Sequence, residues 1–125
     1  MAITVSIFIK VYACGQSITA KKDIHLGDSF LYKPNDERFI TIMQRRFLYE
    51  QCLIKQTIKN SLPNGFRTNG GSPVTNRVYL PYFVLEKNAV TFEFEIHNEN
   101  SFCGTYRNAL QCAKKALKTA GYVIQ

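Results

Sequence analysis

The sequence has no tryptophan, few acidic residues, and no apolar run that approaches the roughly 20 residues needed to span a bilayer. We therefore expect no membrane-spanning helix and no membrane partner. The apolar start, residues 1–15, alternates in polarity and has no basic leader, which favours a strand over a signal peptide. Nine Asp and Glu stand against sixteen Lys and Arg, a net charge of +7. Such an excess in general favours an anionic partner (nucleic acid, a nucleotide, an acidic protein or an anionic membrane surface), of which we expect nucleic acid or a small nucleotide, although a soluble basic domain explains the charge about as well.

Motifs of common catalytic and cofactor sites are also missing. The chain has no glycine spacing of the phosphate-loop or dinucleotide type, no nucleophile elbow and no metalloprotease helix motif. Its four cysteines, Cys14, Cys52, Cys103 and Cys112, lack the close pairs that zinc knuckles use. We therefore expect no metal, no cofactor and no enzymatic activity, and we expect buried free thiols in a reducing compartment, the cytoplasm.

What is present is typical of one globular domain over residues 1–125. Hydrophobic residues make up 46% of the chain and charged residues 20%. A chain of this length buries a core without metal or disulfide support.

Strand patterns occupy both ends of the sequence. Residues 3–12 alternate between apolar and polar side chains, as do residues 90–97. Residues 77–97 read as a hairpin with its turn at 86–88. Shorter strands are expected at 17–22, 29–32, 101–103 and 122–124.

Two helices are expected. Residues 34–37 form a helix start, and no Gly or Pro follows before residue 61, so we predict a long central helix over about 36–60. Its apolar residues cover more than half of its girth, so it is either a core helix or also an interface to a second subunit. These residues are Phe39, Ile40, Ile42, Met43, Phe47, Leu48, Leu53, Ile54 and Ile58. An alanine-rich stripe predicts a second helix over about 106–120.

Together these elements predict an α+β fold: a largely antiparallel sheet of five or six strands with two helices. A ferredoxin-like β-α-β-β-α-β arrangement is the main alternative topology.

Residues 61–76 are rich in Gly, Asn, Ser and Pro and are expected to form a flexible loop. At its middle lie Phe66 and Arg67. An aromatic ring and a cation on such a loop can close on a ligand by stacking and by pairing with phosphate, and the loop can equally be a passive connector.

The second helix carries Arg107, Lys114, Lys115 and Lys118, with Gln111, away from its alanine stripe. Spacings of three and four residues gather these side chains on one surface. They form either a sequence-blind, salt-sensitive phosphate contact or the solvated side of an amphipathic helix.

Glu93, Glu95 and His97 share one face of the strand at 90–97, about 7 Å apart at each step. Two carboxylates and an imidazole in a row suit a divalent metal or acid–base chemistry, whereas the alternative is a solvated strand face.

Two resemblances add to this interpretation. The order hairpin, short strand at 101–103, Gly104-Thr105-Tyr106 and alanine-rich helix resembles the three-strand-plus-helix DNA-binding domain of plant Apetala-type factors and phage integrase arms. That family reads DNA with Arg and Trp on its sheet, whereas this face would carry Glu93 and Glu95, so the resemblance supports the local topology. The small size, the two helices on a sheet and the self-associating long helix resemble the nucleotide sponges that phages use against Thoeris-type defence.

Three functions follow as hypotheses. The first is a non-catalytic binder of a phosphate-bearing ligand, nucleic acid ahead of a small nucleotide, through Phe66, Arg67, Arg107, Lys114, Lys115 and Lys118, in a chain that forms a homo-oligomer through the long helix. The second is a phage or viral anti-defence protein, in the host cytoplasm, that sequesters a nucleotide signal or blocks a host enzyme. The third is a metal-dependent nuclease that uses Glu93, Glu95 and His97.

Overall fold

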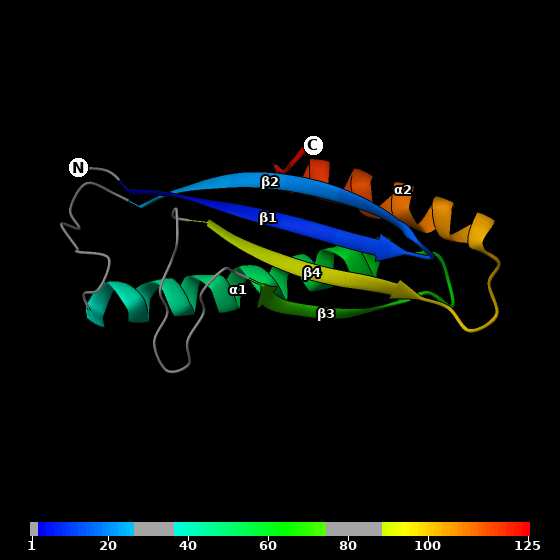
Figure 1. The fold of residues 1–125 in the computed structure, drawn as a ribbon, viewed down its shortest axis with the longest axis horizontal. Helices are drawn as coiled ribbons and strands as arrows, with labels where there is room; N and C mark the ends of the chain where they lie inside the picture. Colours follow the sequence, from blue (N-terminus) through cyan, green and yellow to red (C-terminus); the bar gives the residue numbers. More distant parts are fainter. Residues whose placement is uncertain (1–2, 27–36, 75–88) are drawn as a thin grey trace.

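Two consecutive units, each an antiparallel strand pair followed by a helix, build the fold in the computed structural model, which describes residues 3–26, 37–74 and 89–125 (Figure 1). In chain order the elements are β1 (Ile3–Ala13), β2 (Gln16–Leu26), α1 (Glu37–Ser61), β3 (Arg67–Val74), β4 (Ala89–His97), α2 (Cys103–Thr119) and β5 (Val123–Ile124). Within the part of the chain described, no helix is long and apolar enough to cross a membrane.

The strands form one mixed sheet in the order β3-β4-β1-β2-β5. The central pair β1 and β4 is parallel, and the other neighbours are antiparallel. The predicted α+β class with a largely antiparallel five-stranded sheet is therefore confirmed. The element order differs from the β-α-β-β-α-β alternative, because each helix here follows two strands.

The core lies between the sheet and the two helices. Alternation along β1 and β4 sends Ile9 and Phe92, which are register partners, to the same buried face. Phe47 of α1 packs edge-on against Phe92 with 6.3 Å between ring centroids. In Figure 1, α1 lies behind β3 and β4 and α2 behind β1 and β2, so the two helices share this face and the long helix is only roughly central.

Helix predictions hold closely, whereas one short strand was wrong. The predicted helix 36–60 corresponds to Glu37–Ser61, and β5 supplies the expected edge strand near the C-terminus. Residues 101–103 form no strand, because β4 already pairs with β3 on one side and β1 on the other. The backbone instead turns at residues 99–100, Phe102 is extended, and α2 begins at Cys103, three residues before the predicted start.

Half of the predicted loop at 61–76 is a strand, β3 over Arg67–Val74. β3 pairs with β4 from Arg67 opposite His97 to Gly70 opposite Phe94, and its register shifts between Gly70 and Pro73. A bulge of this kind accommodates glycine and proline, which is why the composition resembled a loop. The strands expected at 29–32 and 77–85 lie outside the described residues.

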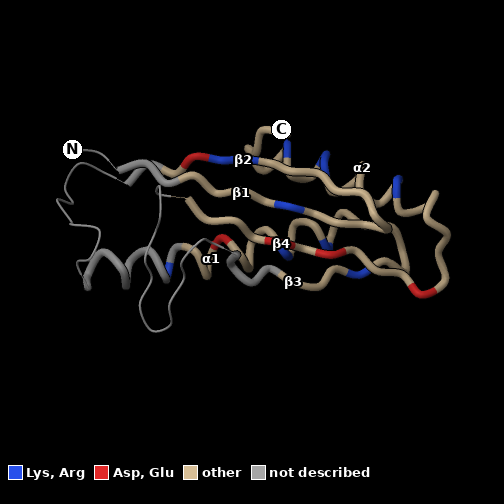
Figure 2. Tube along the Cα trace, viewed as in Figure 1, with Lys and Arg blue, Asp and Glu red and all other residues tan. Residues whose placement is uncertain are grey.

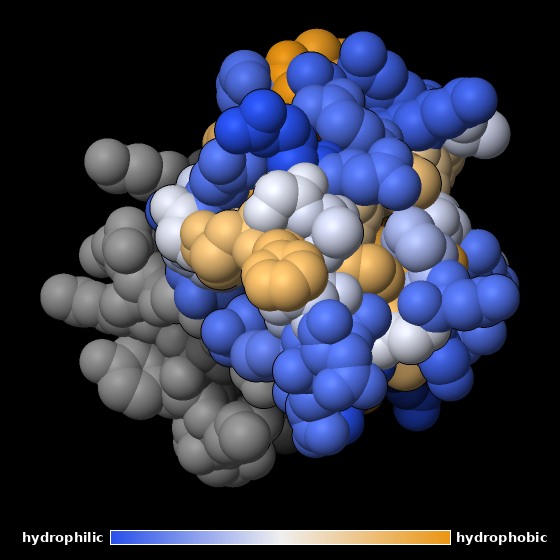
Figure 3. Space-filling view, turned by 90° about the vertical axis from the view of Figure 1, so that its right-hand side faces the viewer, coloured by the Kyte–Doolittle hydropathy of each residue, from blue (hydrophilic) through white to orange (hydrophobic). Residues whose placement is uncertain are grey.

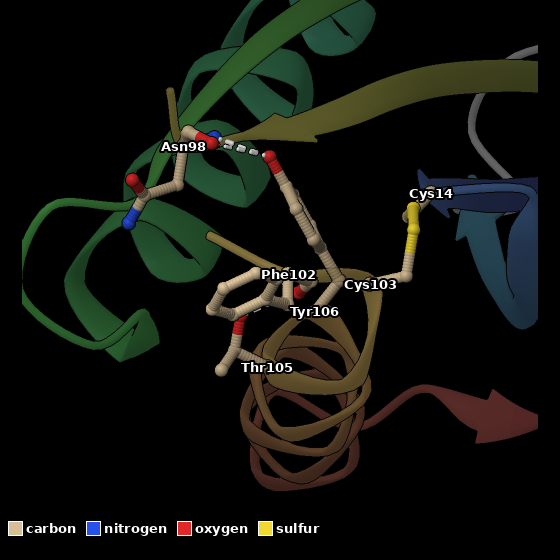
Figure 4. The surroundings of a disulfide bond; sticks show 6 residues. All are labelled: Cys14, Asn98, Phe102, Cys103, Thr105 and Tyr106. Carbon is tan, nitrogen blue, oxygen red and sulfur yellow. Dashed lines mark hydrogen bonds between the residues drawn. A yellow bond between two sulfur atoms is a disulfide. The ribbon is translucent and has the colours of Figure 1, made fainter. Parts of the chain in front are cut away.

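The expectation of four buried free thiols is also wrong. Cys14 and Cys103 form a disulfide with a Cα–Cα distance of 5.6 Å, across a sequence separation of 89 residues (Figure 4). Both are exposed, as is the free Cys52, while Cys112 is half-buried. The bond ties the turn between β1 and β2 to the first residue of α2, a pairing that only the fold brings together.

Candidate functional site

The outward face of α2 carries the cations that the sequence singled out. Arg107, Lys115 and Lys118 are exposed and Lys114 is half-buried. The opposite side of the helix is buried against the sheet through Ala109, Leu110, Ala113 and Leu117. Because spacings of four, seven and eleven residues return to nearly the same side of a helix, these cations form one stripe. The sequence prediction for α2 therefore holds as geometry.

Both ends of α2 are held in place. At its start, the Tyr106 hydroxyl donates to the Asn98 carbonyl and accepts from the Asn98 amide, both at 2.7 Å (Figure 4). At its end, the Lys22 ammonium lies 3.4 Å from the Ala120 carbonyl oxygen, and 5.3 Å from the centroid of the Tyr122 ring. A cation at the C-terminus of a helix complements the helix dipole. The basic stripe is thus a fixed surface.

The described part of α1 also carries exposed positive charge. Arg45, Lys55 and Lys59 are exposed. The acid of this part, Glu50, is only 2% exposed and lies 3.4 Å from the hydroxyl of Tyr122. Among the helix side chains that the structure describes (45, 47–61 and 103–119) there are seven cations, of which six are exposed and Lys114 is half-buried. No carboxylate among these side chains is exposed. We call this surface the basic helix layer.

The open face of the sheet has a different character. Asp23, Glu93 and Glu95 lie there beside Lys10 and Lys21. Several of these groups are paired locally: Lys21 lies 3.8 Å from Asp23, and the Tyr12 hydroxyl lies 3.3 Å from Glu93. Figure 2 shows red segments on β2 and β4 and none on α2. Among the described side chains, exposed charge is therefore segregated, with one sign on the helices and both signs on the sheet.

The row of Glu93, Glu95 and His97 is on this open face, as the alternation predicted. His97 Nε2 lies 3.4 Å from Glu95 Oε2, and Glu93 has its contact with Tyr12. No group of three or more His, Cys, Asp or Glu within the described residues is placed to hold a metal ion.

Phe66 and Arg67 do not join the α2 cations. The Phe66 ring is half-buried and packs at 90° against Tyr106, with 5.3 Å between centroids. Arg67 is opposite His97 in β3, on the open face of the sheet, and lies 3.6 Å from Glu99. The predicted site is therefore split: Phe66 supports the start of α2 and Arg67 belongs to the mixed-charge face.

Sequence reasoning missed the contribution of α1. Leu48 and Leu53 were assigned to its apolar stripe, but they are 61% and 46% exposed, and Tyr49, which was not singled out, is 60% exposed. The signal was available: beyond Glu50, residues 45–61 contain cations but no acid, and Phe47, Ile54 and Ile58 already suffice for one buried face.

Comparison with known proteins adds no assignment, since no protein-family model, curated protein or solved structure matches the chain. Of the Apetala-type pattern, the alanine-rich helix is present, but the Gly104-Thr105-Tyr106 step lies inside it rather than before it, and the strand at 101–103 is absent.

Proposed function

We propose that this protein is a non-catalytic binder of phosphate-bearing polyanions, nucleic acid first, and that the basic helix layer is its binding surface. The observation that carries the proposal is the single sign of exposed charge among the described side chains of that layer: three cations on α1 and four on α2, with the acid Glu50 buried. A surface of this kind attracts phosphate, and its described side chains include no exposed carboxylate to repel it.

The physical basis is counterion release. Each phosphate that a Lys or Arg neutralises releases condensed cations from the nucleic acid, so affinity falls as salt rises, with a slope of about −0.7 per contact for single strands and −0.9 for duplex. Seven contacts set an upper bound of about −5 for a single strand. Such contacts read the backbone, so the binding would depend little on sequence.

The same chemistry suits a small nucleotide held by fewer cations. In that case the protein would act by sequestration, as expected of an anti-defence protein of phage or viral origin. Both versions of the proposal, with a polymer or with a small nucleotide as the ligand, place the protein in the cytoplasm. There the exposed Cys14–Cys103 disulfide would be open to reduction by cellular thiols.

The test compares two double variants that lower the net charge equally. Lys115→Gln/Lys118→Gln removes cations from the basic helix layer, and Lys10→Gln/Lys21→Gln removes them from the open sheet face. Affinity for a fluorescein-labelled 20-nucleotide strand is measured by anisotropy between 50 and 300 mM NaCl. The α2 variant should reduce the steepness of the salt dependence by about 1.4, two contacts at 0.7 each. The salt dependence of affinity for the sheet variant should have the same slope as that of the unmodified protein.

Equal effects of the two variants would mean that net charge alone attracts the strand, and would refute a binding surface on the helices. If no polymer binds at 50 mM salt and one defined nucleotide binds tightly, the ligand is that small nucleotide and not a polymer.

A further inference from the structure

The outward face of α1 carries apolar side chains among its cations. Leu48, Tyr49 and Leu53 are the large apolar residues of α1 that are exposed in its described part, at 61%, 60% and 46%. Removing such groups from water is favourable, so an exposed group of this kind commonly marks a contact site. A contact to phosphate needs cations and gains nothing from apolar side chains, so these three residues indicate a further kind of contact.

Helical spacing interleaves these side chains with the cations. Arg45, Tyr49 and Leu53 follow one another at intervals of four, and so lie along one side of the helix. Leu48 and Lys55 lie seven residues apart on the adjoining side, with Lys59 one turn further. A ligand that spans this face therefore meets a cation, a ring and an aliphatic group within a few helical turns.

Single-stranded nucleic acid matches this alternation. In a duplex the base faces are stacked inside and only phosphates, sugars and groove edges reach the surface, so Tyr49 and the leucines would gain little. In a single strand the bases can turn outward and stack on an aromatic ring while the phosphates contact nearby cations. We infer that the polyanion bound by the basic helix layer is single-stranded, and that Tyr49 is a residue on which its bases stack. This inference rests on the proposed function.

A second copy of the chain is the competing occupant, since the sequence predicted self-association through the long helix. The charges oppose it: α1 against α1 would bring Arg45, Lys55 and Lys59 of two chains together without an exposed acid from the described part of the helix to pair with them. The same charges attract a phosphate backbone. Charge complementarity therefore favours the nucleic acid.

The experiment measures affinity for a labelled 20-nucleotide oligo-dT strand and for a 20-base-pair duplex, with the full chain. Tyr49→Ala should weaken binding of the single strand about 5- to 150-fold, the range found for loss of one base–aromatic stack. Tyr49→Phe keeps the ring and should stay within roughly twofold of the unmodified protein. Phe102→Ala, which removes another exposed aromatic at 84% exposure, is the matched control and should have no effect. The end of the molecule at which α2 begins faces the viewer in Figure 3, where a small apolar patch lies within hydrophilic surface.

The absence of tryptophan provides a direct optical readout. In Tyr49→Trp the introduced indole is the only one in the chain. Its emission should be quenched when the single strand is added and should change little with the duplex, because stacking on a base brings the two π-systems into contact.

The outcomes separate the two proposals. If Lys115→Gln/Lys118→Gln weakens binding of the strand and Tyr49→Ala does not, polyanion binding stands and the single-strand inference fails. If neither the single strand nor the duplex binds at 50 mM salt, the proposal that the protein binds polymeric nucleic acid is wrong. If light scattering shows an oligomer that Tyr49→Ala dissociates, the face is occupied by a second copy and the inference is wrong.

Discussion

Replacing Cys103 by Ser cuts the covalent link between the start of α2 and the turn after β1. The two cysteines are 89 residues apart in sequence and their Cα atoms 5.6 Å apart in space, within the usual range for a disulfide. The start of α2 is otherwise weakly capped, because Phe102 provides no side-chain hydrogen bond and the first turn contains no acid. We expect both a lower global stability and a frayed first turn of α2.

The size of the effect follows from the closed loop. For a separation of 89 residues the chain-entropy relation gives about 4.6 kcal/mol at 25 °C. Measured effects of disulfides are usually smaller, so we expect a loss of about 2–4.6 kcal/mol in the free energy of unfolding. With an unfolding entropy of about 2.1 cal/mol/K per residue, a 125-residue chain would lose at most about 17 °C in Tm.

Urea denaturation of the oxidised protein, of Cys103→Ser and of Cys14→Ser measures this loss. Both single variants should lose the same amount, and the double variant little more, because either one removes the whole bond. Cys52→Ser, at a free and exposed thiol, is the control and should stay within about 0.5 kcal/mol. Thiol titration of the unfolded, unreduced chain should find two reactive groups. Four groups, or a midpoint for Cys103→Ser equal to that of Cys52→Ser, would refute the reasoning.

Two further substitutions test the fold against matched controls. Gly70 has a φ of +103°, and an added Cβ would lie 2.5 Å from the Glu93 carbonyl oxygen, so Gly70→Ala should cost about 2–3 kcal/mol or more in urea denaturation. Gly15→Ala, at a φ of +79° with open space around it, should cost about 1 kcal/mol, and equal losses would contradict the close approach of β3 to β4. Phe47→Ala should destabilise by about 3–5 kcal/mol because the side chain is 2% exposed, whereas Leu48→Ala should stay within about 0.5 kcal/mol. A reversed order of the last two would mean that α1 is rotated about its axis.

Elements with a strong local sequence pattern were predicted correctly, and elements with a weak or misleading local pattern were not. β1 and the described strand β4 alternate strictly, and α1 lacks Gly and Pro over its whole length, so these elements were found within a few residues. β3 was missed because a bulge and a close backbone contact place glycine and proline where a strand usually has β-branched residues. The strand at 101–103 was predicted from local propensity, although no edge of β4 was free to pair with it.

The candidate site shows the same division. The stripe on α2 was found because helical spacing alone places Arg107 and Lys118 on one side. Phe66 and Arg67 were grouped with it because of their residue types, yet one packs on Tyr106 and the other lies on the opposite face of the sheet. Phe66 precedes β3 and Arg67 is its first residue, so the direction of each side chain depended on where the strand begins, which residue type could not show.

The sequence by itself determined the class of fold, the long helix, the amphipathic basic helix and the excess of positive charge, because periodicity and composition are local properties of the chain. The tertiary structure alone decided which of those charges act together. It buried Glu50 beside the hydroxyl of Tyr122, paired Arg67 with Glu99, and joined Cys14 to Cys103 across most of the chain. It also decided that Tyr49 faces solvent, since how much of an apolar helix is covered depends on the area of sheet that it meets. Contacts between residues distant in sequence are set by packing of whole elements, and no local pattern encodes them.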